Sequence, residues 1–330
     1  MKKILVVGSL THDLFLQPRR ETILQKDEMD FLAFCLGDKI RISERHETFG
    51  GGAANVAVGL SRFGGISSAV LGAIGDDESA EKILKNLKSE KVSAHFIQKK
   101  SGGSGFSVIL SSKNGERTVL FCPGKNADLV DFDEKILDDF DGVALQHTSS
   151  GAKKIIEKIA AHFSKKPKKF LSWNPGRESL EKGISAFSDF LKNVHFLLLN
   201  REEAELFSGE KKLDAIFRAF FQNGFSGNLV VTDGRRGAVG GDGKHLFSCP
   251  ILEKSPRVDA LGAGDAFLSG AVGAILRGEN LPTAMKCATI NAAAVVTKFG
   301  AQTGLLPREN IKNQISKLFV HQKPFSFFSK

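Results

Sequence analysis

The sequence predicts an α/β protein with a doubly wound, mostly parallel sheet, helices on both faces and a small additional β-sheet that acts as a lid. Continuous apolar runs, typical of strands buried on both faces, alternate along the chain with amphipathic segments of helical period. Two stretches, 14–48 and 104–122, lack the helical period and indicate β-structure. The alternation predicts the main sheet, and the two exceptions predict the lid.

The first part of the chain predicts a strand, a helix, a second strand and a second helix. The strand KILVVGSL (3–10) is followed by the helix AANVAVGLSRFG (53–64), which we expect to stop at Gly64. The strand SSAVLGAIG (67–75) and the amphipathic helix ESAEKILKNLKSE (78–90) follow.

The lid is expected between and after these elements. The stretch 14–48 includes most of IRISERHETF, and SGFSVILSSKNGERTVLFC (104–122) predicts a hairpin that turns at Lys113, Asn114 and Gly115. The predicted division is an α/β core of 1–12, 49–92 and 123–330, and a lid of 13–48 and 93–122. A sheet beside the first strands of an α/β domain is in a position to close over a site.

The remaining chain repeats the alternation. In order, we expect the strand GVALQHT (142–148), the helix AKKIIEKIAAHFS (152–164), the strands KFLSWNPG (169–176) and VHFLLLN (194–200), the helices REEAELFSG (201–209) and LDAIFRAFFQNG (213–224), and the strand NLVVTDG (228–234).

Composition excludes several classes of function. The net charge of +9 comes from scattered lysines, and the local run 165–169 reads as a solvated loop without interleaved aromatics, so we expect no nucleic-acid partner. No apolar run reaches the length of a membrane span, and the first segment reads as a strand rather than a signal peptide, so a cytoplasmic protein without membrane contact is expected. The four cysteines have neither zinc-ligand nor disulfide-framework spacing.

The stretch DALGAGDAFLSG (259–270) places Gly262, Ala263 and Gly264 at the start of a helix, where glycine is otherwise unfavourable. Bare backbone N–H groups at a helix N-terminus suit a phosphate. Asp265 then reads either as a base beside that phosphate or as a carboxylate favoured by the helix dipole. Gly50-x-Gly52 is in the wrong turn for a dinucleotide fingerprint, and no P-loop pattern occurs.

Two segments together resemble the signature regions of the ribokinase family, the phosphofructokinase-B type of carbohydrate kinase. They are GGGAANVAVGLSRFG (50–64) and DALGAGDAF (259–267). The resemblance continues in order through 8–13, GERTVL (115–120), NREE (200–203), TDGRRG (232–237) and NAAAVVTKFGAQTG (291–304). It implies a ribokinase-like fold and an ATP-dependent phosphotransferase that acts on a primary hydroxyl of a sugar or sugar derivative.

The resemblance also implies roles on the acceptor side. Asp265 would be the general base, and the 262–264 turn would be the anion hole that stabilises the transferring phosphoryl group. The residues implied in binding the acceptor are Asp13, Gly51, Gly52, Asn55, Thr148 and Asp265. Asn55 reads alternatively as a helix cap, and His147 as a substrate contact or a packed side chain.

On the nucleotide side, the resemblance implies ATP with Mg²⁺ and adds a monovalent cation, K⁺. The residues implied for ATP are Asn200, Glu203, Thr232, Gly234, Gly237, Gly264 and Asn291. Asn200 and Glu203 would hold magnesium through water, whereas Asp259, Leu261 and Gly300 would hold potassium beside the 301–303 loop. Asn291 reads alternatively as a buried amide with its hydrogen bonds satisfied.

Departures from the family pattern keep the acceptor open. Ribose-reading members carry a lysine where this chain has Gly52 and a glutamate where Thr148 is placed, so free ribose is in doubt. A nucleoside kinase of the same fold is the main alternative. A sugar-phosphate kinase and a catalytically silent binding relative are further alternatives. Exposed lid strands also predict a homodimer.

Overall fold

The main body of the protein is a ten-stranded sheet. The computed structural model describes residues 1–27, 29–112, 117–129, 131–147, 152–252 and 257–326. The strand order is β16-β15-β14-β13-β12-β11-β10-β1-β6-β7, parallel from β13 to β7 and antiparallel from β13 to β16. The strands are β1 (Lys2–Val7), β6 (Ile66–Ile74), β7 (Ser93–Lys99), β10 (Gly142–Leu145), β11 (Phe170–Trp173), β12 (Phe196–Asn200), β13 (Asn228–Thr232), β14 (Ala238–Gly241), β15 (His245–Cys249) and β16 (His321–Pro324).

Helices cover both faces of this sheet because successive strand residues point to opposite sides. In β1, Ile4 and Val6 belong to one buried cluster and Leu5 and Val7 to the other. The first face carries α1 (Gly52–Phe63), α2 (Glu78–Ser89), α8 (Ala263–Ile275), α9 (Leu281–Val295) and α10 (Arg308–Lys312). The second carries α3 (Ala152–Lys165), α4 (Arg177–Glu181), α5 (Ser188–Leu191), α6 (Arg201–Ser208) and α7 (Leu213–Gln222). The predicted doubly wound fold is confirmed.

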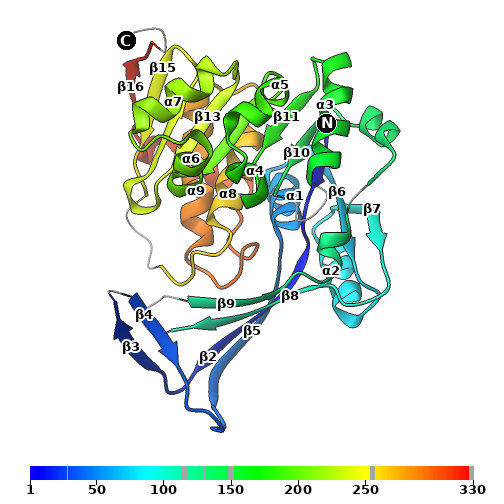
Figure 1. The fold of residues 1–330 in the computed structure, drawn as a ribbon, viewed down its shortest axis with the longest axis vertical. Helices are drawn as coiled ribbons and strands as arrows, with labels where there is room; N and C mark the ends of the chain where they lie inside the picture. The colour runs from blue at the N-terminus through cyan, green and yellow to red at the C-terminus, as the bar shows by residue number, and fades with distance from the viewer. Residues whose placement is uncertain (28, 113–116, 130, 148–151, 253–256, 327–330) are drawn as a thin grey trace.

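A second sheet projects from the main body, below it in Figure 1. Its order is β5-β2-β8-β9, with β2 (Thr11–Pro18), β5 (Ile42–Gly50), β8 (Gly105–Ser111) and β9 (Arg117–Cys122). A separate hairpin, β3 (Thr22–Lys26) and β4 (Met29–Ala33), lies at its far end (Figure 1). The predicted β8–β9 hairpin is observed, although its turn lies outside the described residues.

The observed boundary between the two sheets differs from the predicted one. Strand β7 pairs in parallel with β6 at the edge of the main sheet, whereas 93–122 was assigned to the lid. Within that range, the lid sheet contains only β8, which pairs with β2, and β9, which pairs with β8. The backbone hydrogen bonds of β7 therefore attach it to the core.

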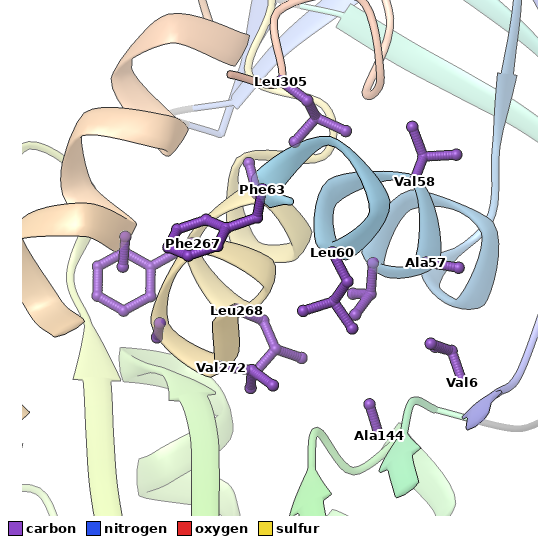
Figure 2. Close-up of a cluster of buried hydrophobic side chains, with 14 of the residues drawn as sticks. Val6, Ala57, Val58, Leu60, Phe63, Ala144, Phe267, Leu268, Val272 and Leu305 are labelled. Carbon is purple, nitrogen blue, oxygen red and sulfur yellow. The ribbon is translucent and has the colours of Figure 1, made fainter. Parts of the chain in front are cut away.

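Helices α1 and α8 pack side by side and bring their N-termini together. Leu60 and Phe63 of α1 lie in one apolar cluster with Phe267, Leu268 and Val272 of α8 (Figure 2). Burial of each such side chain stabilises the fold by roughly 1.5–3 kcal/mol. A Cβ added at Gly59 would lie 2.2 Å from the Ser269 Oγ, so this helix approach requires a glycine. Among the helices described, none is long and apolar enough to cross a membrane.

Candidate active site

The N-terminus of α8 has its backbone uncovered. Gly262 precedes the helix with φ 76°, and no side chain caps the first turn. A Cβ at Gly262 would lie 2.2 Å from the Ala301 Cβ, whereas a Cβ at Gly264 would meet no atom within 4 Å. In this turn the Ala263 N–H donates to the Ala260 carbonyl at 3.3 Å, and no side chain caps the helix. The positive end of the helix dipole and the open space at Gly264 suit an anion.

A cavity of about 510 Å³ opens at this turn, which is the size of ordinary small-ligand pockets. Four of its lining residues are apolar side chains that would accept a flat ring: Ile251, Leu252, Phe267 and Val296. The cavity brings together the predicted nucleotide residues Thr232, Gly234, Gly237 and Gly264 with Ala263. Sequence reasoning missed Arg235 and Arg257, two cations in the same lining.

The structure does not bring Asn291 to this cavity. Its Nδ2 donates to the Ala266 carbonyl at 2.8 Å, and its Oδ1 accepts from the Leu306 N–H at 2.9 Å. The neighbouring α9 residues Thr289, Ala292 and Ala293 line the cavity instead. Asn291 is on the other side of α9, in the arrangement that the buried-amide alternative described.

Asp265 lies in the first turn of α8 and is held by α1. The Asn55 Nδ2 donates to the Asp265 Oδ2 at 2.8 Å. Burial raises the pKa of Asp265, while this hydrogen bond and the nearby His147 act in the opposite direction. A carboxyl whose pKa is moved toward neutrality by desolvation has the property that a general base needs.

Asp13 on lid strand β2 provides a second buried carboxylate. Burial raises its pKa, and hydrogen bonds from Ser107 and Thr11 lower it. Its Oδ1 has no hydrogen-bond partner among the described residues, although the side chain is buried. An unpaired buried carboxylate oxygen is costly, so this atom suits a substrate hydroxyl.

The N-terminus of α1 is closed by Ser9, which sequence reasoning missed. The Gly52 N–H donates to the Ser9 Oγ at 3.1 Å, and the Ala53 N–H donates to the Ser9 carbonyl at 3.1 Å. Gly51 is the N-cap residue of this helix. The Gly52 N–H, which was predicted to contact the acceptor, therefore already has a partner within the protein.

Asn200 and Glu203 form a capping box at the start of α6. The Asn200 Oδ1 accepts from the Glu203 N–H at 2.8 Å, and the Glu203 Oε2 accepts from the Asn200 N–H at 2.9 Å. Burial raises the pKa of Glu203, and the nearby Asp265 carboxylate adds to that shift. The Glu203 Oε1 takes no part in the cap, so the pair can cap the helix and still hold a hydrated cation.

Asp259 is a buried carboxylate beneath the 262–264 turn. Its Oδ1 accepts from the Leu261 N–H at 2.9 Å, and its Oδ2 lies 3.4 Å from the Gly300 N–H. The three residues predicted for a monovalent cation are thus brought together. Arg117 on lid strand β9 approaches the same carboxylate at 3.6 Å, so a cation there would share Asp259 with a guanidinium.

Two further observations limit or extend the site. Thr148 lies outside the described residues. Gln146, directly before the exposed His147, is buried with neither amide atom paired among the described residues, and it faces Gly52. Its position at the end of β10 was readable from the sequence, but its missing partners were not.

Comparison with known proteins identifies the family of the chain. The family model described as pfkB family carbohydrate kinase matches residues 1–308. The chain belongs to the pfkB family of carbohydrate kinases. It is 28% identical over 264 residues to an uncharacterized sugar kinase of Archaeoglobus fulgidus, covering 75% of this chain and 98% of that protein. It is 24% identical to a nucleoside kinase of Methanocaldococcus jannaschii, over 84% and 89% of the two chains.

The fold is also that of a solved ribokinase. The Thermotoga maritima ribokinase superposes with a TM-score of 0.77 at 23% identity, covering 96% of this chain and all of that one. The resemblance to the ribokinase family found in the sequence is therefore confirmed for the family and the fold.

Proposed function

We propose that this kinase transfers the γ-phosphoryl group of ATP to a primary hydroxyl of a free sugar or sugar derivative. The observation that carries the proposal is the Asp265 carboxylate in the first turn of α8, whose neighbours Ala263 and Gly264 line the 510 Å³ cavity. Asp265 takes the proton of the hydroxyl as its oxygen attacks the γ-phosphorus, and ADP leaves. The 262–264 N–H groups bind the charge that develops on the phosphoryl oxygens.

The nucleotide is expected in the cavity, with its ring against Ile251, Leu252 and Phe267. Mg²⁺, held through water by Asn200 and Glu203, would neutralise phosphate charge. Asp13 would accept a hydrogen bond from a ring hydroxyl through its unpaired Oδ1, and Asn55 would contact a second hydroxyl. These contacts place the acceptor between the lid and α8.

A phosphorylation screen with ATP and Mg²⁺ tests the proposal. Pentoses, hexoses, nucleosides and sugar phosphates are offered separately, and ADP release is measured with Asp265→Asn as the blank. Turnover of a free sugar at a primary hydroxyl is expected. The assignment would be contradicted if no acceptor were phosphorylated, or if Asp265→Asn kept the turnover of the wild type.

A nucleoside is the second candidate acceptor. Gly52 carries no side chain, and a Cβ there would lie 3.4 Å from the Gln146 Cβ and 3.5 Å from the exposed His147 ring, so the size of the side chain at 52 would decide whether a base fits beside the sugar. Gly52→Lys should fill that space. We expect the variant to raise the KM for a nucleoside at least tenfold, because the lysine would occupy the place of the base. The KM for a free pentose, which has no base, should not change.

A monovalent cation at Asp259 would reinforce the positive potential of the anion hole. We expect faster turnover in potassium than in sodium, and slower turnover in tetramethylammonium, which is too large for the site. Equal rates in the three salts would remove the cation from the proposal and leave Arg117 as the positive charge beside Asp259.

A homodimer through the lid is proposed from its exposed apolar surface. Leu24, Phe31, Leu120 and Phe121 are each 45–57% exposed, and β9 is an edge strand of its sheet. Sedimentation should give twice the chain mass, and Phe121→Glu should give a monomer. A wild-type monomer at high micromolar concentration would contradict this assembly.

A further inference from the structure

Three side-chain amides form a continuous line from helix α2 to the proposed base. The Asn86 Nδ2 donates to the Gln302 Oε1 at 2.8 Å, and the Gln302 Nε2 donates to the Asn55 Oδ1 at 3.1 Å. The Asn55 Nδ2 then donates to the Asp265 Oδ2 at 2.8 Å. The line joins residues that are far apart in the sequence, and only Asn55 and Asp265 belong to the acceptor site proposed above.

The line has a direction that its last member imposes. An ionised carboxylate only accepts hydrogen bonds, so Asn55 must turn its NH₂ group toward Asp265. Its Oδ1 then faces Gln302, which must present Nε2, and the Gln302 Oε1 is left for the Asn86 NH₂ group. Reversal of any one amide would set two oxygens or two NH₂ groups against each other.

Gln302 is held in place from a second side. The Arg62 Nη1 donates to the backbone carbonyls of Gln302 at 2.7 Å and Leu305 at 3.2 Å. Arg62 is itself fixed by two hydrogen bonds to the Glu90 carboxylate, at 2.8 and 2.7 Å. Asn55 and Gln302 are 4% and 6% exposed. Water therefore has little access to replace a partner that is lost.

We propose that Gln302 is a positioning residue that supports the orientation imposed on the Asn55 amide by Asp265: its Nε2 donates to the Asn55 Oδ1, which favours the NH₂ group over the carbonyl toward Asp265 and the acceptor. This inference rests on the proposed role of Asp265. Because one Asn55 N–H is used by Asp265, the second is the one offered to the substrate, and the acceptor atom that meets it must supply a lone pair.

Gln302→Glu reverses the line. A carboxylate at 302 accepts from Asn86 and from Asn55, so the Asn55 NH₂ turns away and its Oδ1 faces the Asp265 carboxylate. We expect kcat to fall at least tenfold with nucleotide affinity unchanged. The acid limb of the pH–rate profile should move to higher pH, because Asp265 then holds its proton more tightly. The other titratable groups near Asp265, which are Glu203 and His147, are unchanged in this variant.

Gln302→Met is the matched control. It keeps the length of the side chain but demands no polarity, so Asn55 stays oriented by Asp265 alone. We expect a loss of kcat of no more than about threefold and an unmoved acid limb. Equal kcat values and the same pH profile for the Glu and Met variants would overturn the proposal.

A remote pair of variants tests direction without touching the acceptor site. Asn86→Asp can only accept, which turns the Gln302 NH₂ outward and reverses the line, whereas Asn86→Leu imposes no direction. We expect kcat to fall threefold or more in Asn86→Asp and to stay within about twofold in Asn86→Leu. Ser89→Asp, also on α2, adds the same charge but loses the hydrogen bond from the Ser89 Oγ to the Asn86 carbonyl at 2.7 Å, so it is compared with Ser89→Ala. The difference between these two variants controls for through-space repulsion.

A measurement without substrate separates this inference from the proposed function. In Gln302→Glu/Asp265→Asn, the new amide at 265 can donate to the Oδ1 of the reversed Asn55. The urea midpoint of the double variant should therefore be higher than the value expected from adding the midpoint changes of the two single variants. This coupling should vanish in an Asn55→Leu background, whereas direct repulsion between 302 and 265 would persist there. Additive midpoints overturn the line of amides even if Asp265→Asn is inactive. Coupling with an active Asp265→Asn enzyme overturns the proposed base alone.

Discussion

Helices α1 and α8 both begin with glycine-rich turns, yet a side chain caps only the turn at α1. At α1, Ser9 takes the Gly52 N–H with its hydroxyl and the Ala53 N–H with its carbonyl. At α8, no side chain caps the first turn, and Ala263 and Gly264 line the cavity. The one acceptor at the α8 turn is the Ala260 carbonyl, which takes the Ala263 N–H at a long 3.3 Å, so an anion at α8 competes with a weaker partner than Ser9 provides at α1.

The difference assigns different work to the two turns. The closed turn at α1 fixes the start of a helix whose Asn55 reaches across to Asp265. In the proposed function, the open turn at α8 would offer its uncapped helix dipole to the phosphoryl group. Glycine clusters in a sequence therefore indicate close backbone approach, and the surrounding acceptors decide whether the approach is made by the protein itself or by a ligand.

Asp265→Asn is expected to give the largest effect and tests the chemistry at the open turn. The amide keeps the size of the side chain but takes no proton, so turnover should fall roughly 10²-fold or more. Nucleotide affinity by calorimetry should change little. The variant should fold normally. Burial raises the pKa of Asp265, so the charged carboxylate does not stabilise the folded state at neutral pH, and its removal should not lower the free energy of unfolding. More than half of the wild-type rate would refute the role of Asp265 as base.

Gly264→Val tests whether the open turn holds the phosphoryl group. The added side chain projects into space that no protein atom occupies within 4 Å, so it should weaken nucleotide binding tenfold or more without unfolding the protein. Gly52→Ala is the control at the closed turn. Its Cβ meets Gln146 at an ordinary 3.4 Å, and nucleotide affinity should stay unchanged. Equal nucleotide affinities in the two variants would remove the distinction between the turns.

The pH dependence of turnover tests the environment of Asp265. Burial raises the pKa of Asp265, so on acidification the base becomes protonated, and turnover begins to fall, while the pH is still above the ordinary carboxyl pKa of about 3.9. Below that raised pKa the rate should fall about tenfold per pH unit. The limb should be absent from the residual rate of Asp265→Asn. A limb at the ordinary carboxyl value would contradict the desolvation of this site.

Local patterns predicted the alternating elements, because strand and helix periods are properties of short segments. They could not place β7 in the main sheet, since its partner β6 is fixed by tertiary packing. The open α8 turn was predicted from its composition, but the Ser9 cap depends on a contact across 43 positions. The Asn200–Glu203 capping box was readable from its spacing. Gln302 was not, because its role comes from partners on α1 and α2.

Ser9→Ala should give the smallest effect and tests the closed turn directly. The variant removes the hydroxyl that accepts from Gly52, while the Ser9 carbonyl still accepts from Ala53. Loss of one capping acceptor should lower the free energy of unfolding by about 1 kcal/mol, measured by urea denaturation. Nucleotide affinity should not rise, because the freed N–H at α1 lies outside the cavity formed at α8. The KM for the acceptor should rise modestly, since Asn55 follows one turn later on the loosened helix. A gain in nucleotide affinity would mean that the α1 turn also binds phosphate once its cap is removed, and the contrast between the two turns would then rest on Ser9 alone.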